Sequence, residues 1–198
     1  MTVASRFLPK KIASSDFIRE DHSVFSRQWI ELPHADLPLL TPAFLVESYL
    51  CYLRKSTLSI IRPVRSGGKT IFALFGSFLP LLIFSGPEFS EDDHAQSAIL
   101  RINGGLLVQR NECGKGMLSF KIEVVGEGVK VAVEVSDYCP LLLGRAKPSK
   151  LRKWLYRCTQ ALLHRKITSR FLYYLHSQLE SGKSRRGSQS GKRGQPLA

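Results

Sequence analysis

The sequence predicts an α+β protein in which an antiparallel sheet of about six strands packs on a long C-terminal helix, with a shorter N-terminal helix. Short runs of alternating apolar and polar residues, separated by glycine-rich turns, fill residues 58–135, which is typical of half-buried strands. Apolar residues then recur at helical spacing from about residue 150 to 181. The 198 residues, 43% of them hydrophobic, are enough for one sizeable core. We therefore expect a single domain over residues 25–182.

The two ends differ from this domain in composition. Residues 1–24 are polar and mixed, and we expect a flexible arm, while residues 183–198 are rich in Gly, Ser, Lys and Arg, which predicts a disordered basic tail. The N-terminus carries no apolar run typical of a secretion signal. The four cysteines include no C-x-x-C pair and are expected to be free thiols. The expected location is the cytoplasm, with peripheral attachment to a membrane as an option left open.

The shorter helix is expected over residues 42–55, after a short strand at 28–33. Thr41 is a suitable N-cap, and Pro42 suits the first helical position because its missing N–H would be unpaired there anyway. Apolar positions at helical spacing are Leu45, Tyr49, Tyr52 and Leu53.

A hairpin is expected next, with strands at 58–64 and 70–75. Pro63 cannot donate a ladder hydrogen bond, so the first strand should lie at an edge of the sheet or be irregular. The intervening Gly67-Gly68-Lys69-Thr70 resembles the end of a phosphate-binding loop. That loop also requires a glycine where Pro63 stands and a helix afterwards, so the sequence favours a plain hairpin turn.

The following segment is strongly apolar. Residues 78–84 predict a strand that is apolar on both faces, and the run 71–84 is shorter than the roughly 20 residues that span a membrane, which favours a core strand or cavity wall. An acidic surface loop is expected at 90–94. Strands at 98–102 and 105–110 then flank Asn103-Gly104, which is typical of a type I′ turn, or else Gly104-Gly105 marks a bulge within one bent strand.

The most regular pattern lies in residues 117–135. Residues 117–124 and 129–135 alternate strictly and flank Gly126 and Gly128, which predicts a hairpin. The pattern also predicts the register, since a slip by one residue would turn every apolar side chain to the wrong face. The expected pairs are Val124 with Val129, Ile122 with Val131, Phe120 with Val133, Leu118 with Val135 and, on the other face, Glu123 with Lys130.

The long C-terminal helix should run from about Lys150 to Ser181, capped by Ser149. It carries two apolar stripes on roughly opposite sides, which suggests that it is covered on both. The first stripe is Leu151, Trp154, Cys158, Ala161, Thr168, Leu172, Leu175 and Leu179. The second is Tyr156, Leu163, Ile167 and Tyr174.

Net charge is segregated along the chain. Of the +13 total, residues 1–143 contribute nothing, because they hold 15 basic and 15 acidic residues. Residues 144–198 hold 14 basic residues and one acid, Glu180, with aromatic residues interleaved. This pattern is that of a solvated helix surface or of an anion-binding segment, for which nucleic acid or an anionic membrane surface is the partner class. The anion-binding residues predicted are Lys150, Arg152, Lys153, Arg157, Arg165, Lys166, Arg170, Lys183, Arg185 and Arg186.

No grouping of residues in the sequence predicts a catalytic centre, an obligate metal or a cofactor. Asp92-Asp93-His94 and His34-Ala35-Asp36 contain suitable ligand types, but their spacing matches no tight metal site. Glu88 is the only carboxylate beside a strongly apolar run. Two interpretations of Glu88 stay open: a buried acid with a raised pKa, and an ordinary turn residue.

The order of elements resembles the helix-grip fold of the START/polyketide-cyclase-like superfamily over most of residues 25–180. This resemblance rests on layout alone, and it implies a curved sheet that wraps the terminal helix and leaves an apolar cavity. The superfamily has no common catalytic residue to transfer. The resemblance implies that the cavity or the helix side is formed by Ile99, Leu107, Phe120, Ile122, Val133, Trp154 and Cys158.

Three functions remain open at this point. The first is non-enzymatic binding of an apolar small molecule or lipid, with the basic C-terminal helix and tail contacting an anionic surface. The second is a nucleic-acid-associated protein that uses the same helix and tail. A cavity enzyme of cyclase or hydrolase type ranks last, because no acid–base pair supports it. The sequence does not indicate the ligand or an oligomeric state.

Overall fold

A computed structural model describes residues 12–20, 23–76, 79–108, 115–140 and 162–190, with the backbone alone at 35, 162–164 and 182–190. The strands and helices follow one another in the α+β order expected. They are β1 (Ala13–Ile18), β2 (Val24–Pro33), the 3-10 helix η1 (His34–Leu39), α1 (Pro42–Ser56), β3 (Ile61–Ser66), β4 (Lys69–Leu74), β5 (Leu79–Asp92), β6 (Ala95–Gly104), β7 (Met117–Val125), β8 (Gly128–Tyr138) and α3 (Leu162–Ser190).

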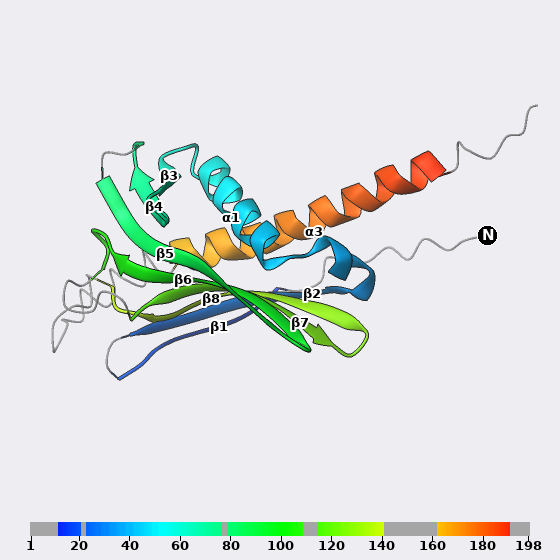
Figure 1. Ribbon diagram of the computed structural model, residues 1–198, viewed down its shortest axis with the longest axis horizontal. Coiled ribbons are helices and arrows are strands. Elements are labelled where there is room, and N and C mark those ends of the chain that lie inside the picture. Colours follow the sequence, from blue (N-terminus) through cyan, green and yellow to red (C-terminus); the bar gives the residue numbers. More distant parts are fainter. Residues whose placement is uncertain (1–11, 21–22, 77–78, 109–114, 141–161, 191–198) are drawn as a thin grey trace, which may run out of the picture.

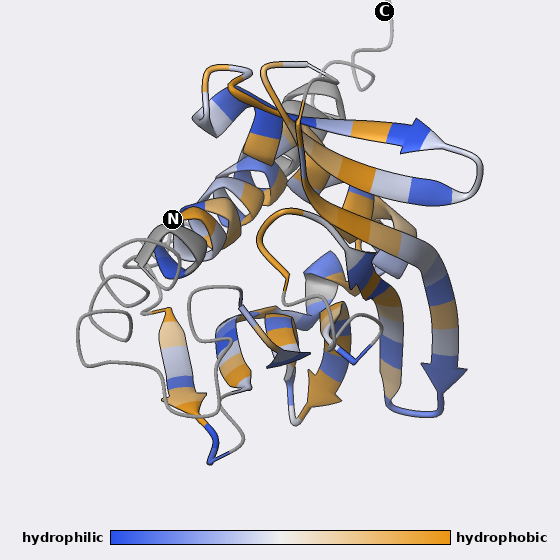
Figure 2. Cartoon of the chain, turned by 90° about the vertical axis from the view of Figure 1, so that its left-hand side faces the viewer, coloured by the Kyte–Doolittle hydropathy of each residue, from blue (hydrophilic) through white to orange (hydrophobic). Residues whose placement is uncertain are grey.

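The described strands form one antiparallel sheet in the order β1-β2-β8-β7-β6-β5-β4-β3. It has eight strands rather than about six, and it twists and curves beneath the two helices (Figure 1). Apolar and polar residues alternate along the strands, as the alternating orange and blue segments of Figure 2 show. As Pro63 predicted, β3 is an edge strand.

The hairpin predicted at 117–135 is confirmed residue by residue. β7 and β8 pair in the expected register, with Phe120 opposite Val133 and Ile122 opposite Val131. Phe120, Ile122 and Val133 are all at most 1% exposed. On the other face, Lys130 Nζ lies 3.5 Å from Glu123 Oε2, as the charge pattern predicted.

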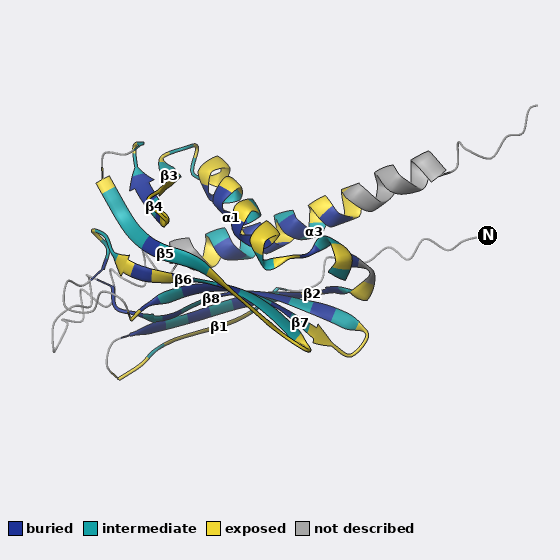
Figure 3. Cartoon of the chain, in the orientation of Figure 1, coloured by how far each residue is buried: buried dark blue, intermediate teal, exposed yellow. Residues whose placement is uncertain are grey.

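Both helices cover the same face of the sheet. α1 begins as predicted, since the Thr41 hydroxyl accepts a hydrogen bond of 3.1 Å from the Phe44 N–H. α1 packs against β6 and β7 and also touches α3, which lies along β2 (Figure 1). Exposed residues accordingly lie on the outward sides of both helices, and buried residues face the sheet (Figure 3).

Aromatic side chains join the three layers of this core. The Tyr49 ring of α1 stands edge-on to Phe120 of β7 and to Phe171 of α3, with ring centroids 5.2 Å apart in each case. Tyr52 reaches Tyr174 at 5.2 Å. The described core residues of the first stripe are Thr168, Leu172, Leu175 and Leu179, and Ile167 and Tyr174 of the second stripe lie half-buried beside them. Lys166, Arg170 and Tyr173 are exposed, so the described part of α3 is covered on one broad side rather than on two.

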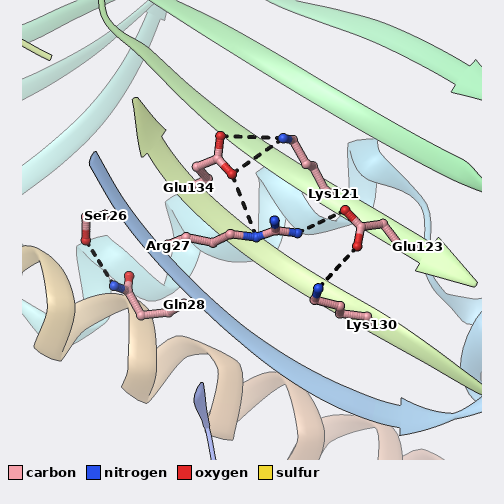
Figure 4. A network of polar contacts seen from close by, with 7 residues as sticks. All are labelled: Ser26, Arg27, Gln28, Lys121, Glu123, Lys130 and Glu134. Atoms are coloured by element: carbon pink, nitrogen blue, oxygen red, sulfur yellow. Dashed lines mark hydrogen bonds and ion pairs between the residues drawn. The ribbon is translucent and has the colours of Figure 1, made fainter. Parts of the chain in front are cut away.

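The opposite face of the sheet carries an ion-pair network (Figure 4). Arg27 Nη2 donates to Glu123 Oε1 at 2.9 Å, and Arg27 Nε lies 3.7 Å from Glu134 Oε2. Lys121 Nζ lies 3.4 Å from Glu134. These charges remain partly solvated, so the network contributes little to stability but marks this face as the wet side of the sheet.

Four local expectations need correction. Asn103-Gly104 forms no hairpin turn, because Gly104 is the last residue of β6 and pairs with Ile83 of β5. The expected acidic loop is shorter, since β5 continues to Asp92. β1 lies within the segment expected to be a flexible arm, and α3 continues past Ser181 to Ser190, into the segment expected to be disordered. In each case the element is longer than its sequence pattern predicts, because pairing with a neighbouring strand or continuation of a helix extends it.

Burial of Tyr49 has a consequence at alkaline pH. Burial raises the pKa of the Tyr49 hydroxyl from 10.0 to about 12, and the Thr168 side chain lowers it by a smaller amount. Between pH 10 and 12 the unfolded chain loses this proton while the folded chain keeps it. The free energy of unfolding should therefore fall by about 2–3 kcal/mol across this window, and this group should have no effect below it.

Denaturant unfolding between pH 8 and 11.5 measures this effect. Tyr49→Phe should remove most of the alkaline slope, and the smaller slope due to Tyr52, whose pKa burial also raises, should remain in both proteins. Equal slopes in the wild type and the variant would show that Tyr49 ionises as freely in the folded chain as in the unfolded one.

Candidate functional site

A cavity of about 390 Å³ lies between the sheet and the two helices. Every described element except η1 contributes to its wall. Its apolar lining residues are Phe17, Ile18, Val24, Phe25, Tyr49, Leu53, Ile61, Phe72, Leu81, Leu82, Phe84, Ile102, Leu107, Leu118, Val135, Tyr138 and Ile167. The only other described residues in the lining are Asp16 and Ser26. A largely apolar wall with one polar corner is typical of a small-molecule site.

The polar corner is built by β1 and β2. Asp16 Oδ1 accepts hydrogen bonds from the Ser26 hydroxyl at 2.6 Å and from Gln28 Nε2 at 3.0 Å. Gln28 Nε2 also donates to the Ser26 Oγ at 2.9 Å, and these two side chains lie on the helix side of β2 (Figure 4). Asp16 Oδ2 lies 3.7 Å from Arg165 Nε, so among the described side chains it has a longer polar contact than Oδ1.

The opposite wall is held in place by backbone hydrogen bonds. Leu106 N–H donates to the Pro80 carbonyl at 2.9 Å, and Leu107 N–H donates to the Leu81 carbonyl at 3.0 Å. The Tyr138 hydroxyl donates to the Leu107 carbonyl at 2.8 Å. The chain after β6 is therefore fastened to the start of β5, and Leu107 is fixed in the wall.

The predicted cavity residues have different positions. Leu107 lines the cavity, while Phe120, Ile122 and Val133 lie on the same sheet face but are packed into the core beside it. Ile99 does not lie on this face, because Ala98 and Leu100 are the core residues of β6 and side chains alternate along a strand. Trp154 and Cys158 lie outside the described residues.

The predicted anion-binding residues are only partly described. Arg165, Lys166 and Arg170 are exposed on α3, and Arg165 pairs with Asp16. Lys183, Arg185 and Arg186 belong to α3 by their backbone alone. Lys150, Arg152, Lys153 and Arg157 lie outside the described residues.

Two alternative chemistries find no support in the described parts of the chain. Gly67 and Gly68 form the turn between β3 and β4, without the helix that a phosphate-binding loop requires. Glu88 is an exposed partner of Arg101, whose Nε lies 3.1 Å from Glu88 Oε1, rather than a buried acid.

Among the described side chains no three His, Cys, Asp or Glu residues are placed to hold a metal ion. No described helix is long and apolar enough to cross a membrane.

Comparison with known proteins assigns no family. No family model matches the chain, and no curated protein matches it. Among solved structures, the crystal structure of CalU16 from Micromonospora echinospora covers 89% of this chain and 94% of its own at 12% identity and a TM-score of 0.31. The crystal structure of Ara h 8.0201 covers 83% and 99% at 16% identity and a TM-score of 0.38. What the structure itself shows is a curved antiparallel sheet with α1 and α3 on one face.

The sequence missed the polar corner. Asp16, Phe17 and Ile18 lie in the segment interpreted as a flexible arm, and only the second half of β2 was predicted as a strand. A signal was present, since Val24, Ser26, Gln28, Ile30 and Leu32 alternate with more exposed residues. Two polar residues on the inward face weakened that pattern, and they are the ones that build the corner.

Proposed function

We propose that the protein binds an apolar small molecule in this cavity. The single observation that supports the proposal most strongly is a cavity of about 390 Å³ whose described lining is almost wholly apolar. Ligand pockets typically measure about 300–1,000 Å³ and have mostly apolar walls. An apolar ligand would gain free energy by removing its own surface and that of the wall from water.

The polar corner suggests one further property of the ligand. Asp16 offers an acceptor beside apolar walls, so the favoured ligand carries a hydroxyl or amine that donates to it. A hydrogen bond to a charged acceptor contributes about 1.5–3 kcal/mol, which would orient the molecule in the cavity. A lipid-like alcohol or a polycyclic phenol has this combination of groups.

Binding of a neutral apolar fluorophore with one N–H donor, N-phenyl-1-naphthylamine, tests the proposal. Val135 is half-buried and lines the cavity, so Val135→Trp should fill part of the volume and weaken binding at least about tenfold. The matched control is Val125→Trp on the same hairpin, where the side chain is 51% exposed and is not part of this cavity's lining. Equal affinities of the two variants would refute a site in this cavity.

The same assay tests the polar corner. In Asp16→Asn the carbonyl oxygen can still accept from Ser26 and Gln28, while an amide donor replaces the oxygen that faces a ligand donor. Binding should weaken about tenfold with the fold unchanged. Native mass spectrometry of the purified protein would identify any molecule that it retains.

A second candidate function is docking of α3 on an anionic membrane surface or on nucleic acid. It is favoured by one exposed side of the helix, on which Lys166, Arg170 and Tyr173 follow one another at helical spacing. Basic residues supply the attraction in both cases, and an exposed aromatic ring adds base stacking in the nucleic-acid case. Steep weakening of binding with salt is expected for either partner.

A further inference from the structure

A group of large apolar side chains is exposed where α1 turns into β3 and where β4 turns toward β5. We call it the apolar tip, and it consists of Leu58, Ile60, Phe75 and Leu79. Leu58 is 86% exposed and Phe75 is 72% exposed. The turns bring these residues together, because Phe75 N–H donates to the Ile60 carbonyl at 2.9 Å and Leu79 pairs with Leu74, the neighbour of Phe75. Exposed apolar groups gathered in one place are typical of a docking surface.

Two residues of the apolar tip adopt backbone angles that are unfavourable for large side chains. Leu58 has φ of 52° and Phe75 has φ of 48°. Glycine or asparagine would adopt these angles more easily than a bulky side chain. The chain thus places large apolar residues where neither burial nor backbone preference favours them. A contact outside the chain would offset both costs.

The charge around the apolar tip is of one sign. Residues 48–87 contain five basic residues and no acidic one. Arg54, Lys55 and Arg62 are exposed close to the tip, and Arg62 Nε donates to the Ser59 carbonyl at 3.2 Å. The other two, Arg65 and Lys69, lie at the far end of the β3–β4 hairpin, where Arg65 pairs with Glu47. Protruding apolar side chains with a cationic rim match the apolar interior and anionic headgroups of a bilayer.

We propose that the apolar tip inserts into the interfacial region of an anionic lipid bilayer while the surrounding Arg and Lys side chains contact the headgroups. The four side chains are exposed to solvent, and large exposed apolar groups of this kind are the ones that enter the interfacial region of a bilayer. The proposal does not depend on a cavity ligand. The tip lies in the part of the sheet that supplies Ile61, Phe72 and Leu82 to the cavity wall, so insertion would bring that wall to the membrane.

Co-sedimentation of the full chain with vesicles of 30% phosphatidylglycerol in phosphatidylcholine tests the insertion. Phe75→Asn should lower the partition coefficient about tenfold, since it removes most of one apolar side chain from the interface. Asparagine tolerates positive φ, so the variant should fold at least as well as the wild type. The matched control is Phe89→Asn, because Phe89 is 58% exposed on a strand next to acidic residues and should not affect binding.

A second measurement separates insertion from simple attraction of basic residues elsewhere. Phe75→Trp should show a blue shift and quenching by lipids brominated on the acyl chain, and Phe89→Trp should show neither change. Binding should also be lost on pure phosphatidylcholine vesicles and weaken with salt. Equal partition of Phe75→Asn and the wild type, or absence of quenching at position 75, would overturn the proposal, and so would equal binding to neutral vesicles.

Discussion

Replacing Phe120 by alanine should lower the free energy of unfolding by about 3–5 kcal/mol. Phe120 is 1% exposed and lies at the centre of the sheet, opposite Val133 of β8 and Ala98 of β6. Its ring stands edge-on to Tyr49 of α1. Truncation therefore removes contacts in the sheet and between the sheet and the helix layer, and close-packed neighbours cannot collapse fully into the space.

Urea unfolding of the wild type and two variants measures this loss. Phe89→Ala is the matched control, because the same side chain is 58% exposed in β5 and should cost less than about 1 kcal/mol. A loss below about 1 kcal/mol for Phe120→Ala as well would mean that the core around Tyr49 is not close-packed.

Replacing Gly105 by alanine should cost about 3–5 kcal/mol although it adds only one methyl group. Gly105 has φ of +118°, which L side chains rarely adopt. A Cβ at this position would lie 2.4 Å from the Leu81 carbonyl oxygen and 2.7 Å from Leu82 Cα. To relieve this clash, the segment that contains Gly105 must move away from Leu81 and Leu82 of β5. That movement breaks the backbone hydrogen bonds that Leu106 and Leu107 donate to Pro80 and Leu81.

The preceding residue provides a control at the same place in the chain. A Cβ on Gly104 would meet nothing within 4 Å, and its φ lies outside the left-handed region, so Gly104→Ala should change stability by less than about 0.5 kcal/mol. Gly105→Ala should also weaken fluorophore binding, since Leu81, Leu82 and Leu107 line the cavity. Equal stability of the two variants would show that the β5 contact adjusts without loss.

The alternation of apolar and polar residues predicted the strand register correctly where a strand is apolar on only one face. In β7 and β8 the alternation is strict, so burial of one face determines the register and leaves Glu123 opposite Lys130. In β6, both Ile99 and Leu100 are apolar, and the sequence does not indicate which one faces the core. Pairing with β7 decides this, because Leu100 lies opposite Leu118 and Ala98 opposite Phe120.

The candidate site was harder to predict than the sheet, because its walls come from distant parts of the chain. Tyr49 and Ile167 were recognised as apolar helix positions, but no local pattern shows that they share a cavity with Leu81. Asp16 looks like an ordinary residue of a polar segment until β1 pairs with β2 and brings it to Ser26. A single acid in an apolar wall is a property of the assembled fold.

The strand order also has a consequence for how the chain folds. From β4 to β8, each strand lies beside the strand that precedes it in sequence, so these pairs close short loops. The pairing of β2 with β8 instead joins Gln28 to Val133 and must close a loop of about a hundred residues, which is entropically slower. β1 and β2 should therefore dock late. The polar corner, which these two strands supply, would be completed after the hairpins that form most of the apolar wall.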